Sequence, residues 1–163
     1  MLLYIITDCD AAAADRVGRQ MSRVRLNAVL YSSSERGKAT ADEILRYQTD
    51  APRSELLDSL DIHDREKAAA FMGTPLEALL GMKRVALVIP ADSFGRYLGP
   101  KLMHLSDKAM DDGVQFAEKE GTISLFPVKM EEQIDTAGYF INSSVHLKVS
   151  DLESIKDLPL SEQ

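Results

Sequence analysis

The chain has 163 residues, a net charge of −7, one cysteine and 45% apolar residues. This composition favours a single soluble globular domain, and the acidic balance argues against nonspecific nucleic-acid binding. One cysteine excludes an internal disulfide, and no apolar run approaches the roughly 20 residues that span a bilayer. We therefore expect a cytoplasmic protein that binds neither nucleic acid nor membrane.

The first predicted strand covers residues 2–7 and leads directly into Asp8, Cys9 and Asp10. Its apolar run carries no charge, which is typical of a strand buried on both faces of an α/β sheet. Ligands in such sheets bind just beyond the carboxyl ends of the strands. Positions 8–10 are therefore the first candidates for a functional site, and Asp10 is also a candidate N-cap for the helix that follows.

Strands and helices alternate along the rest of the chain. Further strands are predicted over residues 27–31, 84–89, 122–128 and 139–148. Helices are predicted over residues 11–24, 35–47, 54–60, 64–71, 75–80, 93–98 and 101–110, with a break at Gly99-Pro100. This alternation predicts crossover connections and a three-layer α/β/α fold with a mostly parallel sheet. Residues 1–150 are expected to form one domain, and residues 151–163 a C-terminal tail.

The stretch LYSSSERGKATADEIL, residues 30–45, resembles the strand, serine turn and helix of the histidine phosphatase superfamily. The family pattern SSxxxRAxxTAxxI is matched in register at Ser32, Arg36, Thr40, Ala41 and Ile44. Weaker similarities to the same family lie upstream of this stretch, at residues 18–21, and downstream of it, at residues 84–98, 121–126 and 139–147. All of them occur in the family's order. The resemblance implies a phosphoglycerate mutase-like fold and an anion-binding role for Arg36 and Ser32.

The residues that this resemblance implies for catalysis are replaced. The family's Arg-His-Gly motif falls on Thr7, Asp8 and Cys9, and its second histidine falls on Pro90. Phosphohistidine chemistry needs an imidazole nucleophile and cationic groups around the transferring phosphoryl group. The resemblance therefore implies a pseudoenzyme, without cofactor or metal, that has a binding, regulatory or assembly role. Its expected partner is a small phosphate-bearing ligand or a protein, and a homo-oligomer is also open.

An alternative interpretation makes the chain an active phosphatase. A strand followed by Asp8-Cys9-Asp10 also resembles the Asp-x-Asp motif of haloacid dehalogenase-like phosphatases. That resemblance implies Asp8 as nucleophile, Asp10 as general acid and Mg²⁺ as cofactor, with Asp92 as a further metal ligand. The sequence departs from that family at Ala12, where the pattern has Thr.

Cys9 and Arg36 each have two possible roles. Acidic neighbours would raise the pKa of a Cys9 thiol, so a buried structural cysteine is favoured over a thiolate nucleophile. Arg36 can offer its planar guanidinium to an anion, or it can pair internally with Asp8 or Asp10. The sequence leaves both roles of Arg36 open.

Overall fold

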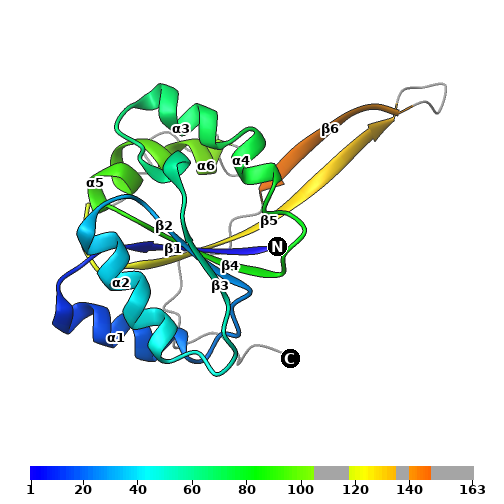
Figure 1. Ribbon diagram of the computed structural model, residues 1–163. Helices are drawn as coiled ribbons and strands as arrows, with labels where there is room; N and C mark the ends of the chain where they lie inside the picture. The colour runs from blue at the N-terminus through cyan, green and yellow to red at the C-terminus, as the bar shows by residue number, and fades with distance from the viewer. Residues whose placement is uncertain (105–117, 135–139, 148–163) are drawn as a thin grey trace.

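A six-stranded sheet forms the centre of the fold in a computed structural model, which describes residues 1–104, 118–134 and 140–147 (Figure 1). The order of its strands in space is β3-β2-β4-β1-β5-β6. The first four strands of the chain are parallel to one another. β5 pairs antiparallel with β1, and β6 pairs antiparallel with β5. The strands are β1 (Leu2–Thr7), β2 (Ala28–Tyr31), β3 (Arg53–Leu56), β4 (Arg84–Ile89), β5 (Ile123–Ile134) and β6 (Phe140–Leu147).

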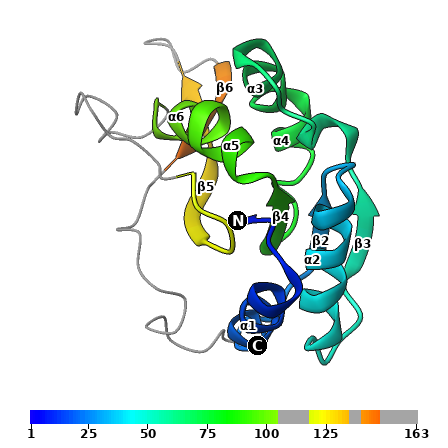
Figure 2. The same cartoon turned by 90° about the vertical axis from the view of Figure 1, so that its left-hand side faces the viewer.

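Helices cover both faces of this sheet and complete three layers (Figures 1 and 2). One face carries α1 (Ala11–Met21) and α2 (Glu35–Arg46). The other face carries α3 (Arg65–Phe71), α4 (Thr74–Glu77), α5 (Ala91–Ser93) and α6 (Gly99–His104). The predicted three-layer α/β/α fold with a mostly parallel sheet is confirmed. No helix in the described ranges has the length and apolar character needed to cross a membrane.

Side chains of β1 contribute alternately to two apolar cores. Leu3 and Ile5 pack in the cluster that contains Phe71, beneath α3 to α6. Tyr4 and Ile6 pack in the cluster that contains Val17, beneath α1 and α2. Because both faces of the strand are buried, every position from Leu3 to Ile6 must be apolar, and this explains the uninterrupted run in the sequence.

The register of the parallel strands brings the candidate residues together. Thr7 pairs with Ile89, so β1 and β4 end at the same edge of the sheet. β4 also pairs in parallel with β2, from Ala28 opposite Val85 to Tyr31 opposite Val88. The segments that follow these three strands therefore meet at one edge of the sheet.

Two predicted helices differ from the structure. Residues 54–60 are not one helix, because Arg53–Leu56 forms β3 along the free edge of β2 and only Asp58–Leu60 turns as a 3₁₀ helix. The helix predicted from residue 93 begins earlier, at Ala91, and Gly99-Pro100 does not break it. A π-helical turn at Phe94–Leu98 precedes the proline, which lacks the N–H for a regular α-helical bond. The predictions for residues 105–110 and for the tail at 151–163 lie outside the described residues.

Candidate functional site

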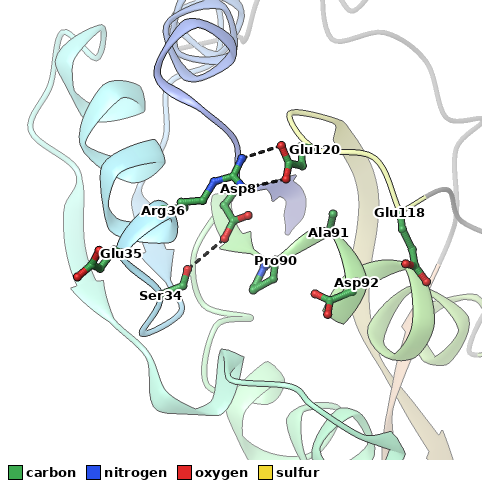
Figure 3. A pocket seen from close by; sticks show the side chains of 9 residues that line it. All are labelled: Asp8, Ser34, Glu35, Arg36, Pro90, Ala91, Asp92, Glu118 and Glu120. Atoms are coloured by element: carbon green, nitrogen blue, oxygen red, sulfur yellow. Dashed lines mark hydrogen bonds and ion pairs between the residues drawn. The ribbon is translucent and has the colours of Figure 1, made fainter.

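A pocket of about 600 Å³ opens beyond the carboxyl ends of β1 and β4 (Figure 3). Four separate segments line it: the residue after β1, the start of α2, the residues after β4, and the chain just before β5. The lining residues are Asp8, Ser34, Glu35, Arg36, Pro90, Ala91, Asp92, Glu118 and Glu120. The pocket therefore lies where an α/β sheet of this topology places its ligands.

Asp8 lies at the base of the pocket and is only 6% exposed. Its backbone N–H donates to the Ile89 carbonyl oxygen at 2.9 Å, and its Oδ2 accepts from Ser34 Oγ at 3.0 Å. Burial raises the pKa of the Asp8 carboxyl, and this effect outweighs the Ser34 hydrogen bond and the attraction of Arg36, which act in the opposite direction. The charged form of Asp8 is therefore disfavoured by its surroundings.

Ser34 connects Asp8 to α2. Its Oγ accepts from the Gly37 backbone N–H at 2.9 Å and so caps the helix. Ser32 lies beneath it, 1% exposed, with its Oγ 3.3 Å from Ser34 Oγ. Ser34, rather than Ser32, is thus the serine that lines the pocket. The predicted anion-binding role of Ser32 would require the turn to open.

Arg36 forms a bidentate ion pair with Glu120 (Figure 3). The two bonds are 2.8 Å from Nη1 to Oε1 and 2.6 Å from Nη2 to Oε2. Arg36 lowers the pKa of Glu120 by hydrogen bonding and charge. Of the two roles left open for Arg36, internal pairing with a carboxylate is observed, but the partner is Glu120 and not Asp8 or Asp10. Glu120 presents both oxygens to the guanidinium, whereas Asp8 is held by Ser34.

Thr7 fixes the turn that carries Glu120. Its Oγ1 donates to the Lys119 carbonyl oxygen at 2.8 Å and accepts from the Thr122 N–H at 2.8 Å. Gly121 completes the turn with φ of +70°, a conformation that glycine adopts without steric cost. Thr7, which the family resemblance aligns with the motif arginine, is thus buried and holds this turn. Sequence reasoning missed Glu120, because it lies in this turn without any recognisable motif.

Comparison with solved structures shows that the fold of this chain is similar to those of known phosphatases and a mutase. The protein histidine phosphatase SixA, solved in complex with tungstate, is 18% identical, with a TM-score of 0.56 over 88% of this chain and 96% of its own. A putative alpha-ribazole-5'-P phosphatase from Escherichia coli is 13% identical, with a TM-score of 0.64 over 95% and 98%. Phosphoglycerate mutase from Plasmodium falciparum is 14% identical, with a TM-score of 0.55 over 99% and 96%.

This chain has the phosphoglycerate mutase-like fold. The predicted phosphoglycerate mutase-like fold class is therefore confirmed. At these low identities the likeness concerns the fold alone. No protein-family model matches the sequence, and no curated protein matches it.

Cys9 and Asp10 lie beside the pocket of this phosphoglycerate mutase-like fold but do not line it. Cys9 is 3% exposed, and its backbone N–H donates to Thr40 Oγ1 at 3.2 Å. The predicted burial of Cys9 is confirmed, and this burial raises the pKa of its thiol, which disfavours the thiolate form. Asp10 caps α1 by accepting from the Ala13 N–H at 2.9 Å, as the sequence predicted.

The alternative magnesium site is not assembled in the described parts of the chain. Asp8 and Asp92 line the pocket, whereas Asp10 faces the start of α1. No group of three His, Cys, Asp or Glu side chains there is arranged to hold a metal ion. The interpretation of Asp8, Asp10 and Asp92 as a haloacid dehalogenase-like site is therefore not favoured.

Carboxylates dominate the charge of the pocket. Five acidic residues line it against one basic residue, Arg36. Glu118 is balanced from outside the lining by Arg96, whose Nε donates to its Oε1 at 2.6 Å. The remaining acidic excess repels a phosphate dianion, and Arg36 is already engaged by Glu120.

The raised pKa of Asp8 predicts an unusual dependence of stability on pH. The folded protein holds the Asp8 proton more tightly than the unfolded chain does. The free energy of unfolding should therefore fall as the pH rises from the ordinary carboxyl pKa, about 3.9, through the raised value. Asp8→Asn keeps an acceptor for Ser34 and removes this loss, so it should be at least as stable as wild type at neutral pH.

Urea denaturation at a series of pH values tests this expectation. Asp92→Asn, an exposed position in the same pocket, is the matched control for removal of one negative charge. Only Asp8→Asn should flatten the pH dependence. A variant Asp8→Asn that is less stable than wild type at neutral pH would show that the Asp8 charge stabilises the fold.

Proposed function

We propose that this chain is a phosphoglycerate mutase-like protein without phosphatase activity, and that its role is binding, regulation or assembly. One observation carries this proposal. The basic side chain in the pocket lining, Arg36, is held by Glu120, while Asp8 and Pro90 stand at the positions that the family resemblance assigns to histidines.

The chemistry of phosphoryl transfer supports this proposal. A nucleophile must attack phosphorus while positive groups stabilise the charge on the transferring oxygens. Pro90 has no ionisable group, and the raised pKa of Asp8 reflects an environment that disfavours its charged, nucleophilic form. The surrounding carboxylates would repel the phosphoryl oxygens rather than stabilise them.

A small phosphate-bearing ligand stays a prediction for this pocket. Arg36 lies at the start of α2, where its guanidinium has the geometry to donate two parallel hydrogen bonds to one phosphate. The same donors now bind Glu120. Binding of a phosphate would thus require Glu120 to leave Arg36. The strength of the Arg36–Glu120 ion pair would therefore determine how tightly the pocket binds phosphate. The cytoplasmic location and a protein partner also stay predictions.

Turnover assays test the absence of catalysis. The purified protein should hydrolyse generic phosphomonoesters without added metal no faster than Asp8→Asn prepared in the same way. Assays with Mg²⁺ should give the same result, because the described carboxylates do not form a metal site. Metal-free hydrolysis that disappears in Arg36→Ala would contradict the proposal, and Mg²⁺-dependent hydrolysis that disappears in Asp8→Asn would support the alternative phosphatase.

Glu120→Gln should make Arg36 available to anions. Removing the competing carboxylate leaves the bidentate donors of Arg36 free, so we expect inorganic phosphate to bind at least about tenfold more tightly than to wild type. Calorimetric titration measures this change. Asp92→Asn is the matched control, because it removes one charge from the same pocket and breaks no ion pair among the described residues. Equal gains in both variants would indicate a general charge effect and no internal competition for Arg36.

A further inference from the structure

The β5–β6 hairpin extends past the body of the sheet (Figure 1). β1 pairs with Ile123–Pro127, and the last link to the body is Val128, whose N–H donates to the Met1 carbonyl oxygen at 2.8 Å. Beyond Val128, β5 pairs with β6 alone among the described strands. The result is a two-stranded arm, an arrangement that is marginally stable in water without further packing.

Among the described residues β6 is the last strand of the sheet, and its sequence lacks the features that protect an exposed edge. Its eight residues, FINSSVHL, contain no Asp, Glu, Lys, Arg or Pro. Natural edge strands are commonly short or carry charged residues, because unpaired N–H and C=O groups otherwise recruit another strand. In this arm the charged residues lie instead on the inner strand, at Lys129, Glu131 and Glu132.

The opposite edge of the same sheet shows the usual protection. β3 has four residues, and two of them, Arg53 and Glu55, are charged and form an ion pair at 2.8 Å. The two edges of one sheet therefore differ in length and in charge. β3 is suited to end the sheet, whereas β6 is suited to continue it.

We propose that β6 is the surface through which two copies of this chain associate, by antiparallel pairing of their β6 strands about a twofold axis. Two identical strands in antiparallel register are self-complementary, as a twofold interface requires. The absence of charge means that the copies do not repel each other along the strand. Full overlap of Phe140–Leu147 places Ser143 of one copy opposite Ser144 of the other. The pairing turns two marginal arms into one four-stranded sheet, and it does not depend on the chemistry of the pocket.

Paired charge variants of the full chain test this assembly by analytical ultracentrifugation. Wild type should be dimeric at micromolar concentrations. Ser143→Lys combined with Ser144→Lys places like charges opposite each other and should weaken the dimer at least about tenfold. Ser143→Lys combined with Ser144→Glu places opposite charges there and should retain the dimer, as should Ser54→Lys on β3.

Three outcomes would overturn the proposal: a monomeric wild type, a dimer that survives the double lysine variant, or a dimer lost in both double variants. Hydrogen exchange of wild type gives a second readout without substitution. Amides in Phe140–Leu147 should gain protection as the dimer forms, while those in Arg53–Leu56 should not. Full protection of β6 in the dilute monomer would mean that another segment of the same chain covers it, which would also overturn the proposal.

Discussion

The parallel pairing of β1 with β4 is the constraint on which the rest of the structure depends. Its register ends both strands at one edge and joins Asp8 to Ile89 through a backbone hydrogen bond. On its other side β1 pairs with β5, and Thr7 holds the turn before β5 in place. A single strand end thus sets the base of the pocket and also presents Glu120 to Arg36.

The position of the pocket follows from the topology of the sheet. Parallel strands whose connections diverge leave a crevice beyond their carboxyl ends, whatever side chains fill it. Here acidic residues make up most of the charged lining of the crevice, and its arginine, Arg36, forms an ion pair with Glu120. Because the fold alone does not determine activity, a shared fold with phosphatases is compatible with the proposed absence of phosphatase activity.

The sequence predicted the parts of the fold that depend on local signals. Uninterrupted apolar runs located β1, β2 and β4, and the serine turn located the start of α2. β3 could not be predicted locally, because Arg53–Leu56 is a strand only through pairing with β2. The same holds for Arg36 and Glu120, which are 84 residues apart and meet only because Thr7 anchors the turn. An ion pair between exposed residues far apart in the chain produces no periodic pattern in the sequence, so it cannot be predicted from the sequence alone.

Crystals of the wild-type protein soaked in tungstate would test the central claim most directly. Tungstate resembles phosphate in shape and charge, and it occupies the related structure of SixA. The account predicts that tungstate alone does not displace Glu120, so that Arg36 remains bonded to Glu120 and the pocket holds no tungstate. Tungstate bound to Arg36, with Glu120 displaced, would contradict the claim that the ion pair with Glu120 keeps anions from Arg36.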